Sequence, residues 1–223
     1  SATAGFDIVS FTGNVTNRTI SHSLSAVPKI MIIKNREATE HWVVYHQKNT
    51  SAPETDYLLL NLANPAADGV TVWNDTAPTS SVFTVSTSPA VNGDGEGMIM
   101  YLWSEKQGFS KFGSFEGTAD ADGPFVYLGF RPAYVTLKNI DEASGEGWMT
   151  YDNKRLGYNE GNSYFQANTA AAEASGNNEI DFLSNGFKLR SSNTASNRAD
   201  THVYFAWAEA PLVNSNGVPC NAR

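Results

Sequence analysis

The residues of this chain best suited to chemistry are carboxylates close in sequence to Trp73, Trp148 and Tyr151. There are five such acids: Asp75, Asp141, Glu142, Glu146 and Asp152. Hydrolysis of a glycosidic bond needs two acids placed on either side of a bound sugar. Acidic residues also gather in turns, where their side-chain oxygens accept backbone N–H groups. We interpret these acids as turn residues, and we predict no catalytic residue and no enzymatic activity.

Sugar binding without cleavage requires less: an aromatic face for the sugar ring, and amide or carboxylate groups for its hydroxyls. Two stretches of the chain supply these types. Together they give six candidate ligand-binding residues: Trp73, Asn74, Asp75, Trp148, Tyr151 and Asp152.

Trp73 is the first of these candidates because of how the tryptophans repeat along the chain. When the two halves are aligned, Trp42 falls opposite Trp148, and Trp103 falls opposite Trp207. A tryptophan repeated at an equivalent position is typical of a core. Trp73 aligns with no tryptophan of the second half, which favours a role at the surface.

The sequence contains no pattern typical of a metal site. The four histidines are His22, His41, His46 and His202. His41 and His46 are five residues apart, so on one strand they would point to opposite faces. The stretch 92–96 resembles a fragment of a calcium-binding loop, but its counterpart in the second half contains Arg198. We predict no metal and no cofactor.

Nucleophilic catalysis has equally little support. No serine lies in a Gly-x-Ser-x-Gly elbow, and the one cysteine, Cys220, lies close to the end of the chain. A single cysteine excludes an internal disulfide, so packing alone must stabilise the fold.

The elements that must position these residues are almost all strands. Short segments rich in β-branched and aromatic residues alternate with Gly, Pro, Asn and Asp, which is typical of an antiparallel sandwich or jelly roll. We expect fourteen strands: 8–11, 29–34, 42–45, 57–60, 70–73, 82–85, 98–103, 125–128, 134–138, 148–151, 164–166, 180–183, 187–190 and 203–207. The alanine-rich stretch 169–174 is too short for a stable helix, and we interpret it as a loop or a single turn.

An internal repeat divides the chain. Pro28 matches Pro132, and Lys34-Asn35 matches Lys138-Asn139, in each case at a shift of 104 residues. The order, spacing and type of such matches agree along the whole length. The sequence therefore predicts a tandem duplication of two lectin-like or jelly-roll β-sandwich units of about 100 residues each. The expected domains are residues 1–107 and 108–211, followed by a tail, 212–223.

Composition and charge exclude several partners. The net charge is −8, and 17% of the 223 residues are charged. An acidic chain is repelled by phosphate backbones and anionic lipid, so we expect neither nucleic acid nor a membrane as a partner. No apolar run approaches the roughly 20 residues that a membrane-spanning helix needs.

Five blocks of sequence carry a resemblance to a known family: residues 5–14, 18–36, 73–79, 111–133 and 180–190. Together they resemble a domain of tailed-bacteriophage virion proteins, often described as tail fibre or tail structural proteins. The resemblance extends from Gly5 to about Pro211.

The resemblance implies a virion protein that is assembled in the cytoplasm of a host bacterium and is extracellular in the mature particle. It implies a structural tail fibre or decoration protein whose partners are other virion proteins and copies of itself. We expect contact with the host surface as well. The alternative is a glycan-binding or glycan-cleaving receptor-recognition domain of a tail fibre.

Overall fold

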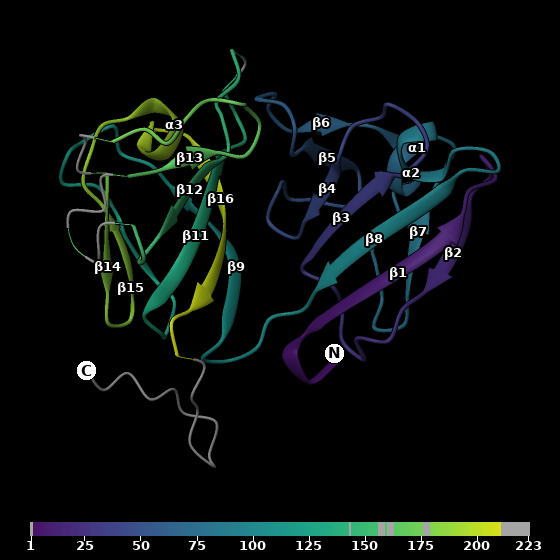
Figure 1. Ribbon diagram of the computed structural model, residues 1–223, viewed down its shortest axis with the longest axis horizontal. Helices are drawn as coiled ribbons and strands as arrows, with labels where there is room; N and C mark the ends of the chain where they lie inside the picture. Colours follow the sequence, from purple (N-terminus) through teal and green to yellow (C-terminus); the bar gives the residue numbers. More distant parts are fainter. Residues whose placement is uncertain (1, 143, 156–158, 160–162, 176–178, 211–223) are drawn as a thin grey trace. The chain divides into compact units, whose positions relative to one another are not determined.

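The computed structural model describes residues 2–142, 144–155, 159, 163–175 and 179–210 of the chain (Figure 1). The chain forms two compact units. Unit 1 comprises Ser1–Asn61 and Ala66–Glu105, and unit 2 comprises Leu62–Pro65 and Lys106–Arg223. The boundary between Glu105 and Lys106 lies two residues before the one expected, and unit 2 also includes a short segment from the first half. The expected tail, 212–223, lies outside the described residues.

Unit 1 is a two-layer sandwich of antiparallel strands. Its larger sheet contains, in spatial order, β1 (Phe6–Thr12), β8 (Gly97–Trp103), β3 (Ile30–Asn35), β4 (Val43–His46), β5 (Asp56–Leu59) and β6 (Ala67–Asp68). The smaller sheet pairs β2 (Arg18–Ser21) with β7 (Val82–Val85). Three single helical turns complete the unit: η1 (Ala2–Ala4), α1 (Val70–Trp73) and α2 (Pro89–Asn92). Figure 1 shows β1 and β8 as two long neighbouring strands, in purple and teal.

Unit 2 is also a two-layer antiparallel sandwich. Its larger sheet contains, in order, β13 (Phe165–Gln166), β12 (Met149–Asp152), β11 (Pro132–Asn139), β16 (Thr201–Ala208) and β9 (Ser110–Glu116). The second sheet contains β10 (Phe125–Tyr127), β15 (Gly186–Leu189) and β14 (Ile180–Leu183). One helical turn, α3 (Thr194–Asn197), precedes β16.

The central strands pair in the same order and register in both units. In unit 1, Trp103 of β8 lies between Phe6 of β1 and Ile30 of β3. In unit 2, Trp207 of β16 lies between Ser110 of β9 and Tyr134 of β11. Each number in unit 2 is 104 higher than its counterpart (110−6, 207−103 and 134−30), which is the shift seen in the sequence.

Each sandwich encloses its own hydrophobic core. The core of unit 1 includes Met31, Trp73, Phe83 and Met100, and the core of unit 2 includes Leu137, Tyr151, Phe187 and Tyr204. Because β3 is buried on both faces, its apolar run shows none of the alternation of a half-exposed strand. The predicted all-β sandwich is confirmed.

Two buried asparagines connect the layers at matching places. Asn92, at the end of α2, donates from Nδ2 to the carbonyl oxygens of Thr16 and Ser86, both at 2.8 Å. Asn197, at the end of α3, donates to those of Asp120 and Ser191, at 2.7 and 2.8 Å. Both side chains are fully buried. They satisfy backbone groups that no strand pairs, which is why a polar residue is stable there.

Most expected strands are present, with one reversal and several omissions. Val70–Trp73, expected as a strand, is a single helical turn that begins after Gly69 and ends at Asn74 in the left-handed conformation (φ 56°). A helical turn directs the adjacent Val72 and Trp73 into the core together, whereas a strand would direct them to opposite faces. Six further elements were not predicted from the sequence: η1, β2, β6, β9, α2 and α3. Residues 169–174 form no helix, as predicted.

The expectation that repeated tryptophans are core residues is confirmed for Trp148 alone. Trp148 is fully buried. Trp42, Trp103 and Trp207 are half-buried.

Candidate functional site

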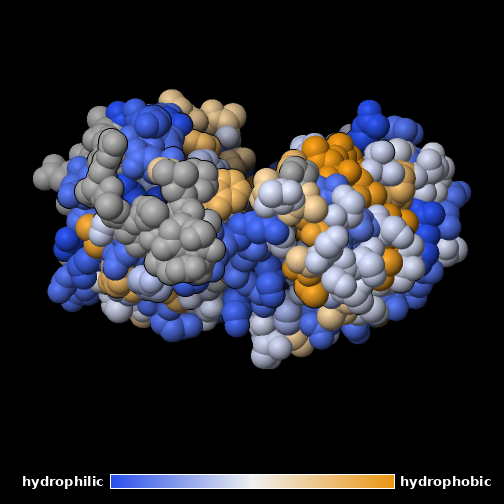
Figure 2. Space-filling view, turned by 90° about the horizontal axis from the view of Figure 1, so that it is seen from below, coloured by the Kyte–Doolittle hydropathy of each residue, from blue (hydrophilic) through white to orange (hydrophobic). Residues whose placement is uncertain are grey.

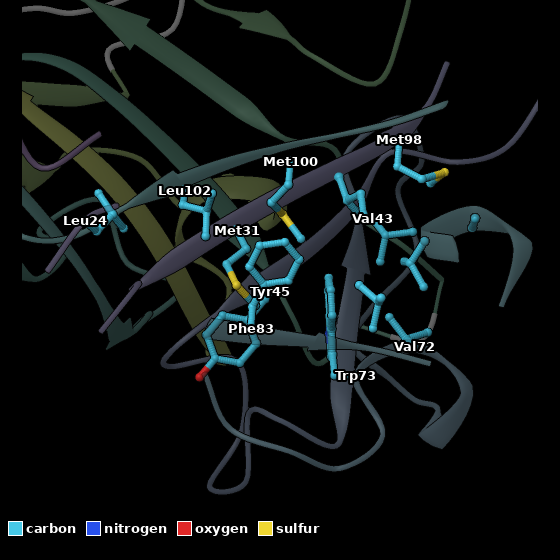
Figure 3. Close-up of a cluster of buried hydrophobic side chains, with 14 residues drawn as sticks. Leu24, Met31, Val43, Tyr45, Val72, Trp73, Phe83, Met98, Met100 and Leu102 are labelled. Carbon is cyan, nitrogen blue, oxygen red and sulfur yellow. The ribbon is translucent and has the colours of Figure 1, made fainter. Parts of the chain in front are cut away.

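Trp73, the first sugar-binding candidate, lies inside the core of unit 1. Its side chain is 1% exposed, and its ring meets Tyr45 edge-on with centroids 6.2 Å apart. Figure 3 shows it among Tyr45, Phe83 and Val72. Neither face of the indole is open to a sugar ring. The lack of a matching tryptophan in unit 2 did not indicate a surface position. A large side chain that occurs in one unit alone can also fill the core of that unit, while other residues fill the core of the other unit.

Asn74 and Asp75 form the turn that ends α1. Both have positive φ, 56° and 46°, a conformation that asparagine and aspartate tolerate better than most residues. The Asn74 side-chain oxygen accepts a hydrogen bond from Asn17 Nδ2 at 2.6 Å. The residue types are therefore explained by backbone conformation.

The other three candidates also serve the framework, in unit 2. Trp148 and Tyr151 are buried, and Asp152 accepts backbone N–H groups of Lys154 and Arg155 and pairs with the Arg155 guanidinium at 2.7 Å. Within each unit, therefore, the three predicted residues do not form a sugar-binding surface.

A buried carboxylate that the sequence analysis missed lies in the core of unit 2. Glu179 is fully buried and accepts hydrogen bonds from Tyr151 Oη (2.9 Å), Asn193 Nδ2 (2.7 Å) and Ser196 Oγ (3.0 Å). Burial, together with the Glu179 carboxylate, raises the pKa of Tyr151 well above 10. Three donors satisfy the acid, which makes it a structural link between β12, β14 and α3.

Two of the remaining acids of the predicted set, Asp141 and Glu142, also make structural contacts. Asp141 accepts the Thr201 backbone N–H at 2.9 Å, and Glu142 accepts the Ser144 N–H and pairs with Arg198. The bond from Ser144 to Glu142 spans two residues and fits the interpretation of Glu142 as a turn residue, whereas the bond to Asp141 comes from Thr201, 60 residues away.

The histidines lie at separate places in the two units. His22 hydrogen-bonds to the Thr79 carbonyl oxygen, and His46 accepts the Lys48 backbone N–H. His41 hydrogen-bonds to the Asn61 side chain. His202 is fully buried, stacks on Phe115 at 5.1 Å, and hydrogen-bonds through Nδ1 to the Asp200 carbonyl oxygen. Among the residues that the structure describes, no three His, Cys, Asp or Glu side chains gather as a metal would need. Cys220 lies outside those residues.

Lys138 is a fully buried cation held by backbone oxygens. Its ammonium donates to the carbonyl oxygens of Asn139 (2.6 Å), Glu146 (2.8 Å) and Ala63 (3.0 Å). Burial lowers its pKa from 10.5 to about 8. In unit 1 the matching Lys34 donates to Asn35 and Ala38 and is half-buried. Both lysines therefore close the loop that follows a central strand.

The most exposed aromatic side chains of the described chain lie on β10 in unit 2. Phe125 is 45% exposed and Tyr127 is 58% exposed, while Val126 between them enters the core. Residues at i and i+2 of a strand share one face, so both rings lie on the outer face of the β10–β15–β14 sheet. The alternation Phe-Val-Tyr was the available sequence signal, but it does not say which face is open.

A glycine and a lysine on β15 lie beside these rings. The strand register places Lys188 opposite Phe125 and Gly186 opposite Tyr127. A Cβ added at Gly186 would collide with the Val126 carbonyl and lie 3.1 Å from the Phe125 ring. Glycine is therefore required where the Phe125 ring approaches the backbone. We call Phe125, Tyr127, Gly186 and Lys188 the aromatic platform.

Unit 1 exposes a different kind of apolar surface. Its exposed large hydrophobic residues are aliphatic: Ile8 (51%), Val27 (41%) and Val70 (52%). In Figure 2 hydrophobic surface, in orange, is visible on this unit at the right of the view. Single exposed aliphatic residues are ordinary on protein surfaces and identify no ligand.

The fold and these sites define the class: an all-β protein of two sandwich units whose central strands share one order. The chain belongs to the family described as Domain of unknown function (DUF7483), whose model matches residues 1–211. The match thus includes both units. No curated protein and no solved structure matches the chain. In the described part of the chain, none of the helices has the length and apolar character needed to cross a membrane.

Proposed function

We propose that this chain is a non-enzymatic structural protein of a tailed-bacteriophage virion, either a tail fibre or a decoration protein of the tail or capsid. It packs against other virion proteins and copies of itself, and it contacts the host surface. It is assembled in the cytoplasm of the host bacterium and is extracellular in the mature particle.

One observation carries the proposal: a block that resembles phage virion proteins contributes a framework residue of unit 1, and the bonds of that residue recur at the matching position of unit 2. Lys34 and Asn35 lie in the block 18–36, and Asn35 is fully buried with its side-chain oxygen accepting the N–H groups of Glu37 and Ala38. Asn139 makes the same pair of bonds to Asp141 and Glu142. Loop-closing residues repeated in both units of this chain support a role that depends on the shape of the sandwiches, as that of a structural protein does.

We also propose that the two units arose by duplication of one module. The central strands keep a constant shift of 104 residues in their pairing, and the Asn35 and Asn139 bonds recur at that same shift. A loop-closing asparagine at the same register position in both units supports descent from one ancestor.

Purified phage particles that encode the chain test the virion role. We expect mass spectrometry to find the chain in a fixed copy number per particle, and a cryo-electron microscopy map to contain density that fits the two sandwiches. Absence of the chain from particles purified to constant composition would contradict the proposal.

A separate measurement tests the non-enzymatic character. The purified chain, incubated with polysaccharide from the host surface, should release no new reducing ends. Release of oligosaccharides that increases with protein concentration would show a glycan-cleaving enzyme instead.

A further inference from the structure

We propose that the aromatic platform of unit 2 is a carbohydrate-binding surface, and that its ligand is a polysaccharide of pyranose sugars. The proposal concerns an individual surface of the folded chain and does not depend on membership of a virion.

The two rings supply flat apolar surface for sugar stacking. Successive side chains on one face of a strand are about 7 Å apart, so Phe125 and Tyr127 can contact neighbouring sugar units of one polymer. A pyranose ring presents C–H groups on its faces, which pack on an aromatic face, while its hydroxyls point outward. Phe125 is 45% exposed and Tyr127 is 58% exposed, so part of each side chain is open to a ligand.

The contacts around the rings hold them in place before any ligand arrives. The Lys111 ammonium lies 5.3 Å from the centre of the Tyr127 ring and donates to the Tyr127 carbonyl oxygen at 2.7 Å. Phe125 approaches Gly186, where a larger residue would not fit. A surface whose rings are already positioned loses less conformational entropy on binding.

Charged groups of both signs surround the platform and match the chemistry of sugar hydroxyls, which both donate and accept hydrogen bonds. Lys188 Nζ contacts Asp122 at 2.8 Å and donates to the Gly123 carbonyl oxygen at 2.7 Å, while Arg190 Nε contacts Asp181 at 2.5 Å. The Lys188 ammonium lowers the pKa of Asp122 through its hydrogen bond and its charge. These pairs orient donors and acceptors beside the rings.

The local charge also suits this ligand. Lys111, Lys188 and Arg190 against Asp122 and Asp181 give three positive and two negative charges, a local balance of +1 within a chain of net charge −8. Hydrophobic surface alone would equally suit a protein or lipid partner. The paired charges beside the aromatic rings favour a hydroxyl-rich ligand.

The matching positions of unit 1 carry none of these groups. Thr19 and Ser21 of β2 are the exposed residues where β10 carries Phe125 and Tyr127. Their partners on β7 are Thr84 and Val82, where β15 carries Lys188 and Gly186. The aromatic platform is therefore specific to unit 2 and is not a consequence of the strand framework that both units share.

Affinity electrophoresis of the full chain tests the proposal, in gels that contain dextran, alginate or bacterial lipopolysaccharide, together with a microbial glycan array. We expect at least one polysaccharide to retard the native chain. The pair Phe125→Ala and Tyr127→Ala should weaken binding by about tenfold or more. Ile8→Ala, an equally exposed apolar position on unit 1, should bind as the native chain does.

A second pair of variants separates aromatic stacking from general hydrophobic contact. Phe125→Leu with Tyr127→Leu keeps apolar side chains on the same strand, and circular dichroism should show an unchanged fold. Loss of polysaccharide binding in this folded variant supports the proposal. Native-like binding by the leucine pair, or no binding of the native chain to any glycan tested, would overturn it.

Discussion

Unit 1 and unit 2 share a framework and differ at the surface. The backbone pairings of the central strands and the asparagines at 35 and 139, and at 92 and 197, recur in both. The outer face of the smaller sheet does not recur: unit 1 has Thr19 and Ser21 where unit 2 has Phe125 and Tyr127. A buried polar side chain must keep its hydrogen bonds, so the residue type at such a position recurs in both units. An exposed position has no such requirement, and its residue type differs between the units.

The two cores also differ at one matched buried position. Met98 in unit 1 and His202 in unit 2 occupy the same register position, opposite Asn35 and Asn139 respectively. Both are fully buried. The framework therefore accepts either an apolar or a titratable side chain there, and each choice has a consequence that can be measured.

The largest expected effect is confined to unit 1. Trp73→Ala should lower the free energy of unfolding of that unit by about 3–5 kcal/mol, because it removes a buried indole from the core. Hydrogen exchange followed by mass spectrometry can report each unit separately. Val70→Ala, on the exposed side of the same helical turn, serves as the control and should change stability by about 0.5 kcal/mol or less. A similar small effect of Trp73→Ala would contradict the burial described above.

The two framework asparagines should be equivalent. Asn92→Ala and Asn197→Ala each remove two hydrogen bonds from a buried amide to backbone carbonyl oxygens, so each should destabilise its own unit by about 2 kcal/mol. Urea denaturation with unit-specific hydrogen exchange measures both. Asp94→Ala, an exposed neighbour of α2, is the control. A large loss in one unit and none in the other would break the structural equivalence.

A smaller effect is expected from the pH dependence of stability, because unit 2 has the titratable His202 where unit 1 has Met98. Burial lowers the pKa of His202 below 6.5, although Asp200 and Asp141 oppose the shift and Lys138 reinforces it. Below pH 6.5 the unfolded chain binds a proton that the folded unit binds less readily, so the stability of unit 2 should fall as the pH falls.

The substitution His202→Met, which copies unit 1, should remove that part of the pH dependence. Urea denaturation of unit 2 at pH 7.5 and pH 5.5 compares the native chain with the variant. An equal loss of stability in both proteins on acidification would assign the pH dependence to other groups.

The smallest expected effect concerns the outer face of unit 1. Thr19→Phe with Ser21→Tyr copies the exposed rings of unit 2 and should change stability by only about 0.5 kcal/mol, because both positions are exposed. We expect no glycan binding by this face when it is added to a chain that carries Phe125→Ala and Tyr127→Ala. Affinity electrophoresis measures this, and restored binding would show that two exposed rings suffice without Gly186 and Lys188.

Most of the strands, the two-unit organisation and the matching positions could be predicted from the sequence alone. The alternation Phe125-Val126-Tyr127 and the repeated Lys-Asn pairs are local patterns, and local patterns report the period of a strand and the order of elements. For this reason most expected strands are present, and the shift of 104 residues reappears as a shift in strand pairing.

Which of these residues are buried depends on tertiary contacts. Trp73 enters the core because Val70–Trp73 forms a helical turn, and Glu179 meets Tyr151, 28 residues away in the chain, inside unit 2. Phe125 and Tyr127 remain exposed because Val126 fills the inward position. Burial depends on contacts between residues distant in sequence, and a local pattern cannot report those contacts.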